Sequence, residues 1–147
     1  MEEEKRQHLE FIQNIITRMN TNSFQIKGLA VAIVSAFLAV YASTSNVIFI
    51  FLGILPTILF WFLDSYYLQQ ERKFRGIYND VTGLKTLNEV KPYEMPIQKY
   101  TKEEDKQFSF WNVFFSKTII WLYLSIIVFL FTIGTILIYK DCLINLL

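Results

Sequence analysis

The sequence has few of the residues from which catalytic and metal sites are usually built. It contains one histidine, His8, and one cysteine, Cys142, among 147 residues. The lone cysteine excludes an intrachain disulfide, and the His, Cys, Asp and Glu residues lack the spacing of metal ligands. No glycine-rich stretch has the pattern of a phosphate-binding loop. We therefore expect no catalytic residue, no metal site and no cofactor, which argues against an enzyme.

The sequence also has little net charge and few helix-breaking residues. The formal net charge is +1, which gives no electrostatic basis for binding duplex nucleic acid. The chain has only 5 glycines and 3 prolines, and none lies between Phe60 and Arg75. One uninterrupted helix can therefore run through this segment.

Hydrophobic residues, by contrast, make up 53% of the chain and fall into three blocks. The third block, Thr118 to Tyr139, carries no charge and as a helix covers roughly 33 Å, enough to cross a hydrocarbon core of about 30 Å. The second runs from Asn46 to Leu63, and the first spans only if it runs from Phe24 to Thr44. These two could also form a buried hairpin of a soluble protein, but too little amphipathic sequence remains to cover them. We predict an all-α membrane protein with three transmembrane helices.

Basic residues are distributed unevenly around these blocks. Every Lys and Arg except Lys140 lies before span two or between spans two and three, and none lies in the short link between spans one and two. The positive-inside rule then predicts that the N-terminus and the long middle segment are cytoplasmic and that the C-terminus is outside.

The same topology places Lys27, Asp64 and Lys117 at about one depth, at the cytoplasmic edge of the membrane. We favour an interface ion pair between Asp64 and one of the two lysines, and the alternative is a charged ring at the mouth of a pore.

These patterns divide the chain into five segments. They are an amphipathic cytosolic helix (1–22), a transmembrane hairpin (23–64), a cytosolic helical extension of the second span (65–83), a cytosolic loop with an interfacial aromatic segment (84–117) and a third transmembrane helix with a short tail (118–147). The first is expected to end at the polar run from Asn20 to Ser23, and the third at Gly83.

The apolar stripe of the N-terminal helix has three possible partners: the membrane surface, the helix that follows span two, or a neighbouring subunit. We favour the helix after span two, because the stripe is narrow and basic residues are too few for a strong headgroup anchor.

Two tyrosines in the loop, Tyr93 and Tyr100, lie close in sequence to Lys91 and Lys99. Such a set can hold a nucleobase and a phosphate. A solvated loop is the favoured interpretation.

Two helix faces carry polar residues at helical spacing. Four residues of the helix after span two share a face and are our candidates for coupling and gating: Asp64, Glu71, Arg75 and Tyr78. Four hydroxyls on one face of span three are the candidate pore lining: Thr118, Ser125, Thr132 and Thr135. This stripe indicates either helix packing, with each hydroxyl bonded to the preceding turn, or the water-facing wall of an oligomeric pore.

The stretch from Phe60 to Val81 also carries a resemblance. Its pattern is Phe60-Trp61, Leu63-Asp64, Tyr67-Leu68, Glu71, Phe74-Arg75, Tyr78 and Val81, after a helical hairpin with an N-terminal amphipathic helix. It resembles small membrane effectors of bacterial anti-phage defence, of the Hailong type encoded beside a nucleotidyltransferase. It is also similar to the two-span effector domains that accompany nucleotide-second-messenger enzymes. The resemblance covers Glu2 to Gly83.

The resemblance implies a homo-oligomeric channel in the bacterial inner membrane. A ligand made by a nucleotidyltransferase, an oligonucleotide or a cyclic nucleotide, would hold the channel shut or open it, and opening would depolarise the infected cell. The residues themselves indicate only that conduction needs several copies, because three short spans cannot enclose a pore. The competing hypothesis is a non-conducting membrane scaffold that recruits cytosolic partners.

Overall fold

The computed structural model describes residues 2–85, 87–101, 103 and 105–144. The fold is all-α and 83% helical, with no strand in these ranges. Three helical stretches are long and apolar enough to cross a membrane, which suggests a membrane protein: Glu2–Thr44, Ile48–Thr82 and Lys117–Leu143. The prediction of three long apolar helices is confirmed, and residues 145–147 of the expected tail lie outside the described ranges.

The first stretch is a single helix, α1 (Glu2–Thr44). The prediction that an amphipathic helix ends between Asn20 and Ser23 is therefore wrong. This run has no glycine or proline, and helix geometry accommodates its polar groups: the Thr21 hydroxyl donates to the Thr17 carbonyl oxygen at 2.9 Å. Ser23 is buried against a neighbouring helix. The amphipathic and apolar parts of the N-terminal region thus form one helix of roughly 65 Å.

The second stretch is interrupted near its start, where α2 (Ile48–Leu52) and α3 (Ile54–Thr82) meet at Gly53. Pro56 lies one turn further on. Because proline has no N–H, the carbonyl oxygen of Leu52 loses its helical partner at this point, which explains the interruption. At its other end α3 stops at Gly83, whose φ of 80° is left-handed, as the sequence predicts.

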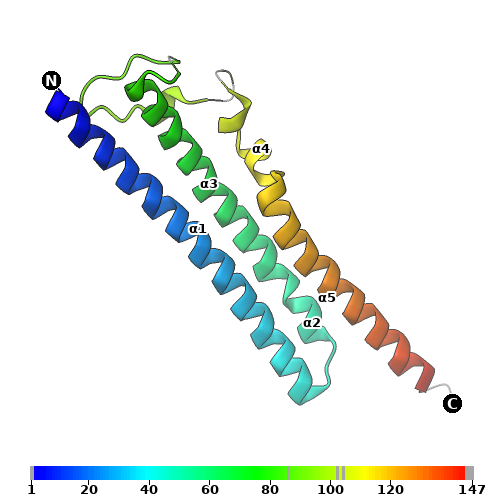
Figure 1. Ribbon diagram of the computed structural model, residues 1–147. Coiled ribbons are helices and arrows are strands. Elements are labelled where there is room, and N and C mark those ends of the chain that lie inside the picture. Colours follow the sequence, from blue (N-terminus) through cyan, green and yellow to red (C-terminus); the bar gives the residue numbers. More distant parts are fainter. Residues whose placement is uncertain (1, 86, 102, 104, 145–147) are drawn as a thin grey trace.

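The long helices lie side by side, with α3 between α1 and α5 (Lys117–Ile144) (Figure 1). Among the described residues, α5 contacts α2, α3 and α4 (Phe110–Phe114) but does not lie along α1. The N-terminus, the end of α3 and the loop after it share one end of the molecule. The link between α1 and α2 and the C-terminal end of α5 lie at the other end (Figure 1).

The segment after α3 folds back onto the helices. We call residues 84–108 the lobe; it contains two 3₁₀ turns, η1 (Ile97–Lys99) and η2 (Lys106–Phe108). Tyr100 and Phe108 are buried in one apolar cluster with side chains of α1 and α3, namely Ile12, Ile16, Phe74 and Ile77. The preference for a solvated loop is therefore wrong for Tyr100. The same cluster confirms that the apolar stripe of the N-terminal helix packs against the helix after span two.

The aromatic segment before the third span is partly core. Phe114 is buried, whereas Trp111 and Phe115 are each 59% exposed. Helix α4 is separated from α5 by a bend at Phe115 and Ser116, so the lead-in helix is short and distinct from the span.

Candidate functional site

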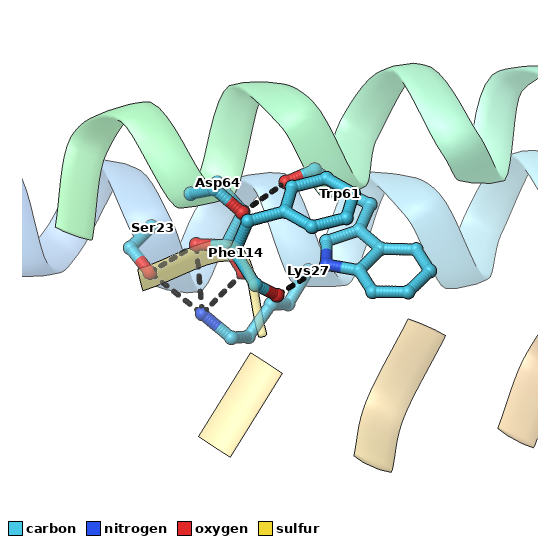
Figure 2. A network of polar contacts seen from close by, with 6 residues as sticks. Ser23, Lys27, Trp61, Asp64 and Phe114 are labelled. Atoms are coloured by element: carbon cyan, nitrogen blue, oxygen red, sulfur yellow. Dashed lines mark hydrogen bonds and ion pairs between the residues drawn. The ribbon is translucent and has the colours of Figure 1, made fainter. Parts of the chain in front are cut away.

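A buried charge cluster joins α1 to α3. The Lys27 ammonium lies 2.7 Å from Asp64 Oδ2 and 2.9 Å from Asp64 Oδ1. The Ser23 hydroxyl donates to Asp64 Oδ1 and accepts a hydrogen bond from Lys27 Nζ at 2.6 Å. Ser23 and Lys27 are one turn apart on α1 and face the same point of α3 (Figure 2). The three side chains form a closed polar triangle between two helices.

Burial makes this cluster energetically important. The Asp64 side chain is 0% exposed and that of Lys27 is 27% exposed. A carboxylate removed from water is strongly destabilising unless a cation and hydrogen bonds compensate it. Because both compensating groups come from α1, separating α1 from α3 at this level leaves Asp64 without its partners.

Aromatic side chains cover the triangle on the side of the third long helix. The Trp61 indole stacks on Phe114 with ring centroids 4.4 Å apart and on Tyr123 of α5 at 6.1 Å. The Trp61 indole N–H donates to the Phe114 carbonyl oxygen at 3.0 Å (Figure 2). These rings pack together where α3, α4 and α5 meet.

Tyr123 is the residue of α5 that lies next to the charge cluster. Its side chain is fully buried, and its hydroxyl interacts electrostatically with Asp64. The arrangement falls short of a hydrogen bond, so the hydroxyl is one of three buried side-chain polar atoms without a hydrogen-bond partner among the described residues. The others are Asp64 Oδ2, whose contact with Lys27 is ionic, and Ser116 Oγ.

Lys117 takes no part in this cluster, which corrects its assignment to the interface ion pair. It is exposed at the start of α5, and within the described ranges no ion pair involves it. The α5 side chains that face α3 are Ile119 and Tyr123, both buried. Lys117 is two residues from Ile119 and so points to the opposite side of the helix.

The rest of the predicted coupling face follows α3 away from Asp64. Glu71 is buried and pairs with Arg75, whose Nε lies 2.6 Å from Glu71 Oε1, while the Arg75 side chain is 60% exposed. Arg75 and Tyr78 line a cavity of about 250 Å³ with Asn79 and with Gln13 and Ile16 of α1. Asp64, Arg75 and Tyr78 therefore all lie at the contact between α3 and α1.

The hydroxyl stripe is placed differently. All four of its residues are exposed on the single chain: Thr118, Ser125, Thr132 and Thr135. The hydroxyls of Ser125, Thr132 and Thr135 donate to backbone carbonyl oxygens of their own helix at 2.7 to 3.0 Å. They are satisfied without a partner helix and lie apart from the Asp64 cluster.

Sequence reasoning missed three polar residues that hold the structure together. Ser23 was assigned to a helix end, although its spacing of four from Lys27 places both on one face. His8 is buried and its Nε2 lies 3.1 Å from the Glu94 carbonyl oxygen in the lobe. Asp80, at the end of α3, accepts hydrogen bonds from the Tyr100 hydroxyl (2.6 Å) and from two backbone N–H groups of the lobe.

The lobe does not present its tyrosines as a pair. Tyr100 is buried, whereas Tyr93 is half-exposed and donates from its hydroxyl to Gln7 Oε1 at 2.9 Å. In the same turn the Lys91 backbone N–H donates to the Glu94 carboxylate, and this bond lowers the pKa of Glu94. Tyr93 and Tyr100 therefore hold the lobe to α1 and α3 respectively.

The polar interactions of this site, among the described residues, are ion pairs and hydrogen bonds. Within these ranges, no group of three or more His, Cys, Asp or Glu residues is placed to hold a metal ion. The charged groups that are buried, Asp64 and Glu71, face basic partners at the contacts between helices. Comparison with protein-family models, with curated protein sequences and with solved structures finds no match for this chain.

Proposed function

We propose that this chain is one subunit of a homo-oligomeric membrane effector whose copies together form a gated ion-conducting pore. The three long apolar helices support placement in a membrane. The distribution of Lys and Arg supports an inner-membrane orientation with the N-terminus and the lobe in the cytoplasm and the C-terminus outside. Because three helices in a row enclose no channel, conduction needs several copies.

The continuity of α1 and α3 carries the proposal. Each runs without a break from the apolar region into the lobe end of the molecule (Figure 1). The Lys27–Asp64 ion pair ties the two helices at the level where the sequence changes from apolar to polar. A rigid helix transmits a displacement along its whole length, and the ion pair couples the displacement of one helix to the other. A change at the lobe end therefore reaches the membrane part of both helices.

The exposed hydroxyl face of α5 is the candidate pore wall. A face that the single chain leaves uncovered is available to line a space between copies. Hydroxyls bonded to their own helix still offer oxygen lone pairs to water and ions. Thr118, Ser125, Thr132 and Thr135 are therefore the residues we assign to the conducting path.

Control by a nucleotide-derived ligand and a role in anti-phage defence rest on the resemblance of the stretch from Phe60 to Val81. The cavity of about 250 Å³ between α1 and α3 has room for one part of such a ligand. Beside it, Arg75 supplies a guanidinium, which is paired with Glu71, and Tyr78 supplies an aromatic ring. Guanidinium groups bind phosphate, and aromatic rings stack on bases. In this proposal Asp64, Glu71, Arg75 and Tyr78 couple ligand binding to the pore.

A non-conducting scaffold is the second candidate, and one observation favours it. The lobe end exposes large apolar side chains, including Phe11 at 52% and Leu84 at 74%. Such side chains are suited to contact with a protein partner. In this case the three long helices only anchor the chain in the membrane.

Membrane potential in living bacteria tests the proposal. We expect cells that express the chain to lose their potential either on expression or on phage infection, as followed with a potential-sensitive dye. Cells that express the Asp64→Asn variant at equal membrane abundance serve as the comparison, because this change removes the charge that ties α3 to α1. An unchanged potential in every condition, together with stable co-purification of a cytosolic partner, would support the scaffold instead.

A further inference from the structure

A groove on the surface of the α1–α3 pair crosses the level of the Lys27–Asp64 ion pair. Its volume is about 260 Å³, which is below the roughly 300–1,000 Å³ of pockets that enclose a whole drug-sized ligand. It therefore fits one segment of a larger molecule. The lining residues are Asn22, Gln25, Ile26, Leu29, Leu63 and Tyr67.

The groove is polar at one end and apolar at the other. Asn22 and Gln25 precede Lys27 in α1, and Tyr67 follows Asp64 in the antiparallel α3, so these three lie toward the lobe. Leu29 follows Lys27 and Leu63 precedes Asp64, which places both leucines toward the apolar part of the helices. The change in polarity thus runs along the helix axes, the same direction as the change from headgroups to hydrocarbon in a bilayer.

The polar end has unused hydrogen-bonding capacity. Within the described part of the chain, the side chains of Asn22, Gln25 and Tyr67 make no hydrogen bond. Their amide N–H and phenolic O–H groups are donors of the kind that phosphate and ester oxygens accept.

A cation lies one helical turn from this polar end, on the side of the lobe. Arg18 is four residues before Asn22 on α1 and therefore on the same face. It is exposed, and no ion pair in the described ranges involves it.

We propose that this groove binds a glycerophospholipid of the cytoplasmic leaflet. Its phosphate and ester oxygens accept hydrogen bonds from Asn22, Gln25 and Tyr67, and one acyl chain lies along Leu29 and Leu63. Arg18 gives the site a preference for an anionic headgroup. This inference rests on the membrane placement in the proposed function, but not on conduction. Because the groove spans the contact between α1 and α3 beside Lys27–Asp64, a bound lipid touches both helices and stabilises their contact.

Lipid retention by the purified full chain tests this site. The protein is transferred to a detergent that strips loosely held lipid, titrated with phosphatidylglycerol or phosphatidylethanolamine, and examined by native mass spectrometry. The groove variant is Asn22→Leu with Gln25→Leu. The matched control is Asn20→Leu, an exposed amide on another face of the same helix. A conservative variant, Tyr67→Phe, removes only the hydroxyl. It keeps the test valid if the double variant fails to fold.

The wild type and Asn20→Leu are expected to retain phosphatidylglycerol more strongly than phosphatidylethanolamine. Tyr67→Phe should weaken retention roughly fivefold and the double variant roughly 10- to 30-fold, since one neutral hydrogen bond contributes about 1 kcal/mol. Arg18→Gln should remove the preference between the two lipids. Equal retention by the wild type, Tyr67→Phe and the double variant would overturn the site.

A second copy of the chain is the competing occupant of the groove. In a Cys142→Ser background, Leu29→Cys of one copy would then form an oxidative cross-link with its neighbour, and added lipid would not reduce it. That result would also overturn the lipid site. Neither readout requires ion flux, so failure of this inference is distinct from failure of the pore.

Discussion

At the scale of single residues, Asp64 determines how the helices fit together. Its carboxylate is fully buried and receives Lys27 and Ser23 from α1, while Tyr123 of α5 interacts with it electrostatically. A buried ion pair need not stabilise more than apolar residues in its place, but the loss of one partner leaves an uncompensated charge. The observed register of α1 and α3 is one that brings both partners to Asp64.

Charge exchange tests this pairing. Asp64→Lys places two cations together and should destabilise the protein by about 3–5 kcal/mol, since a buried charge is left without a partner. Adding Lys27→Asp restores opposite charges and should recover much of the loss, whereas adding Lys117→Asp should recover none. Thermal unfolding of the detergent-solubilised protein, monitored by size-exclusion chromatography, ranks the variants by stability. Rescue by Lys117→Asp alone would contradict the geometry of the cluster.

Gly76 is the residue that lets the lobe pack onto α3. A Cβ at this position would lie 2.7 Å from the Tyr100 ring and 2.9 Å from the Phe108 ring. Gly76→Ala should therefore destabilise the protein by about 1–3 kcal/mol through overpacking, despite the better helix propensity of alanine. We expect a lower midpoint of thermal unfolding and earlier proteolysis of the lobe.

Gly28→Ala is the matched control for this substitution. Gly28 also lies inside a long helix, but a Cβ there meets nothing within 4 Å. Alanine should then leave stability unchanged or raise it by about 0.5–1 kcal/mol. Equal effects of the two substitutions would show that the packing of Tyr100 and Phe108 does not require a glycine at position 76.

At the scale of elements, α5 is the long helix least attached to the others. Among the described residues it lies against α2, α3 and α4 but not along α1, and its polar neighbour at the charge cluster, Tyr123, interacts with Asp64 electrostatically. Gly134 permits a close approach of α2, since a Cβ there would lie 2.6 Å from the Phe51 ring. Apolar packing, which includes the stacking of Trp61 on Tyr123, therefore makes up most of the contact between α5 and the other helices.

Cysteine accessibility tests which face of α5 meets water. In a Cys142→Ser background, Thr132→Cys should react with a charged, water-soluble thiol reagent at least about tenfold faster than Phe131→Cys, because only a hydrated thiol ionises readily. Phe131 is a fair comparison, since it is adjacent in sequence, 57% exposed and on another side of the helix. Equal, slow reaction of both cysteines would mean that the hydroxyl stripe faces lipid or a packed helix.

Helical periodicity predicted the elements better than their connections. The spacing of apolar residues was enough to predict the contact of Ile12 and Ile16 with α3, and glycine chemistry was enough for the end of that helix at Gly83. Polar residues misled the prediction at Asn20 to Ser23, because a polar run can end a helix or supply a buried hydroxyl. Only the partner helix decides between the two.

Contacts between distant segments lay beyond sequence reasoning. The fit of Tyr100 against Gly76 and the bond of its hydroxyl to Asp80 join residues of the lobe to α3 across a loop. No local pattern encodes such a pairing. For the charge cluster, the topology narrowed the partner of Asp64 to two lysines, and the side chain packing of α5 excluded Lys117.

At the scale of the whole molecule, α1 and α3 connect the lobe to an apolar region, and the third long helix, α5, packs against α2 and α3. The lobe is held to α1 through His8 and to α3 through Asp80, so it contacts both helices. In our proposal several copies surround a pore lined by α5, and the Lys27–Asp64 pair sets whether that pore conducts.

Ion flux from liposomes tests this central claim most directly. The purified wild type and Asp64→Asn are reconstituted at equal density into potassium-loaded liposomes, and efflux is followed after the external potassium is removed. If the pair sets the state of a pore, at least one of the two proteins conducts and their rates differ, whichever state the ligand-free wild type adopts. The absence of efflux from both, with each protein shown to be oligomeric in the bilayer, would contradict the account.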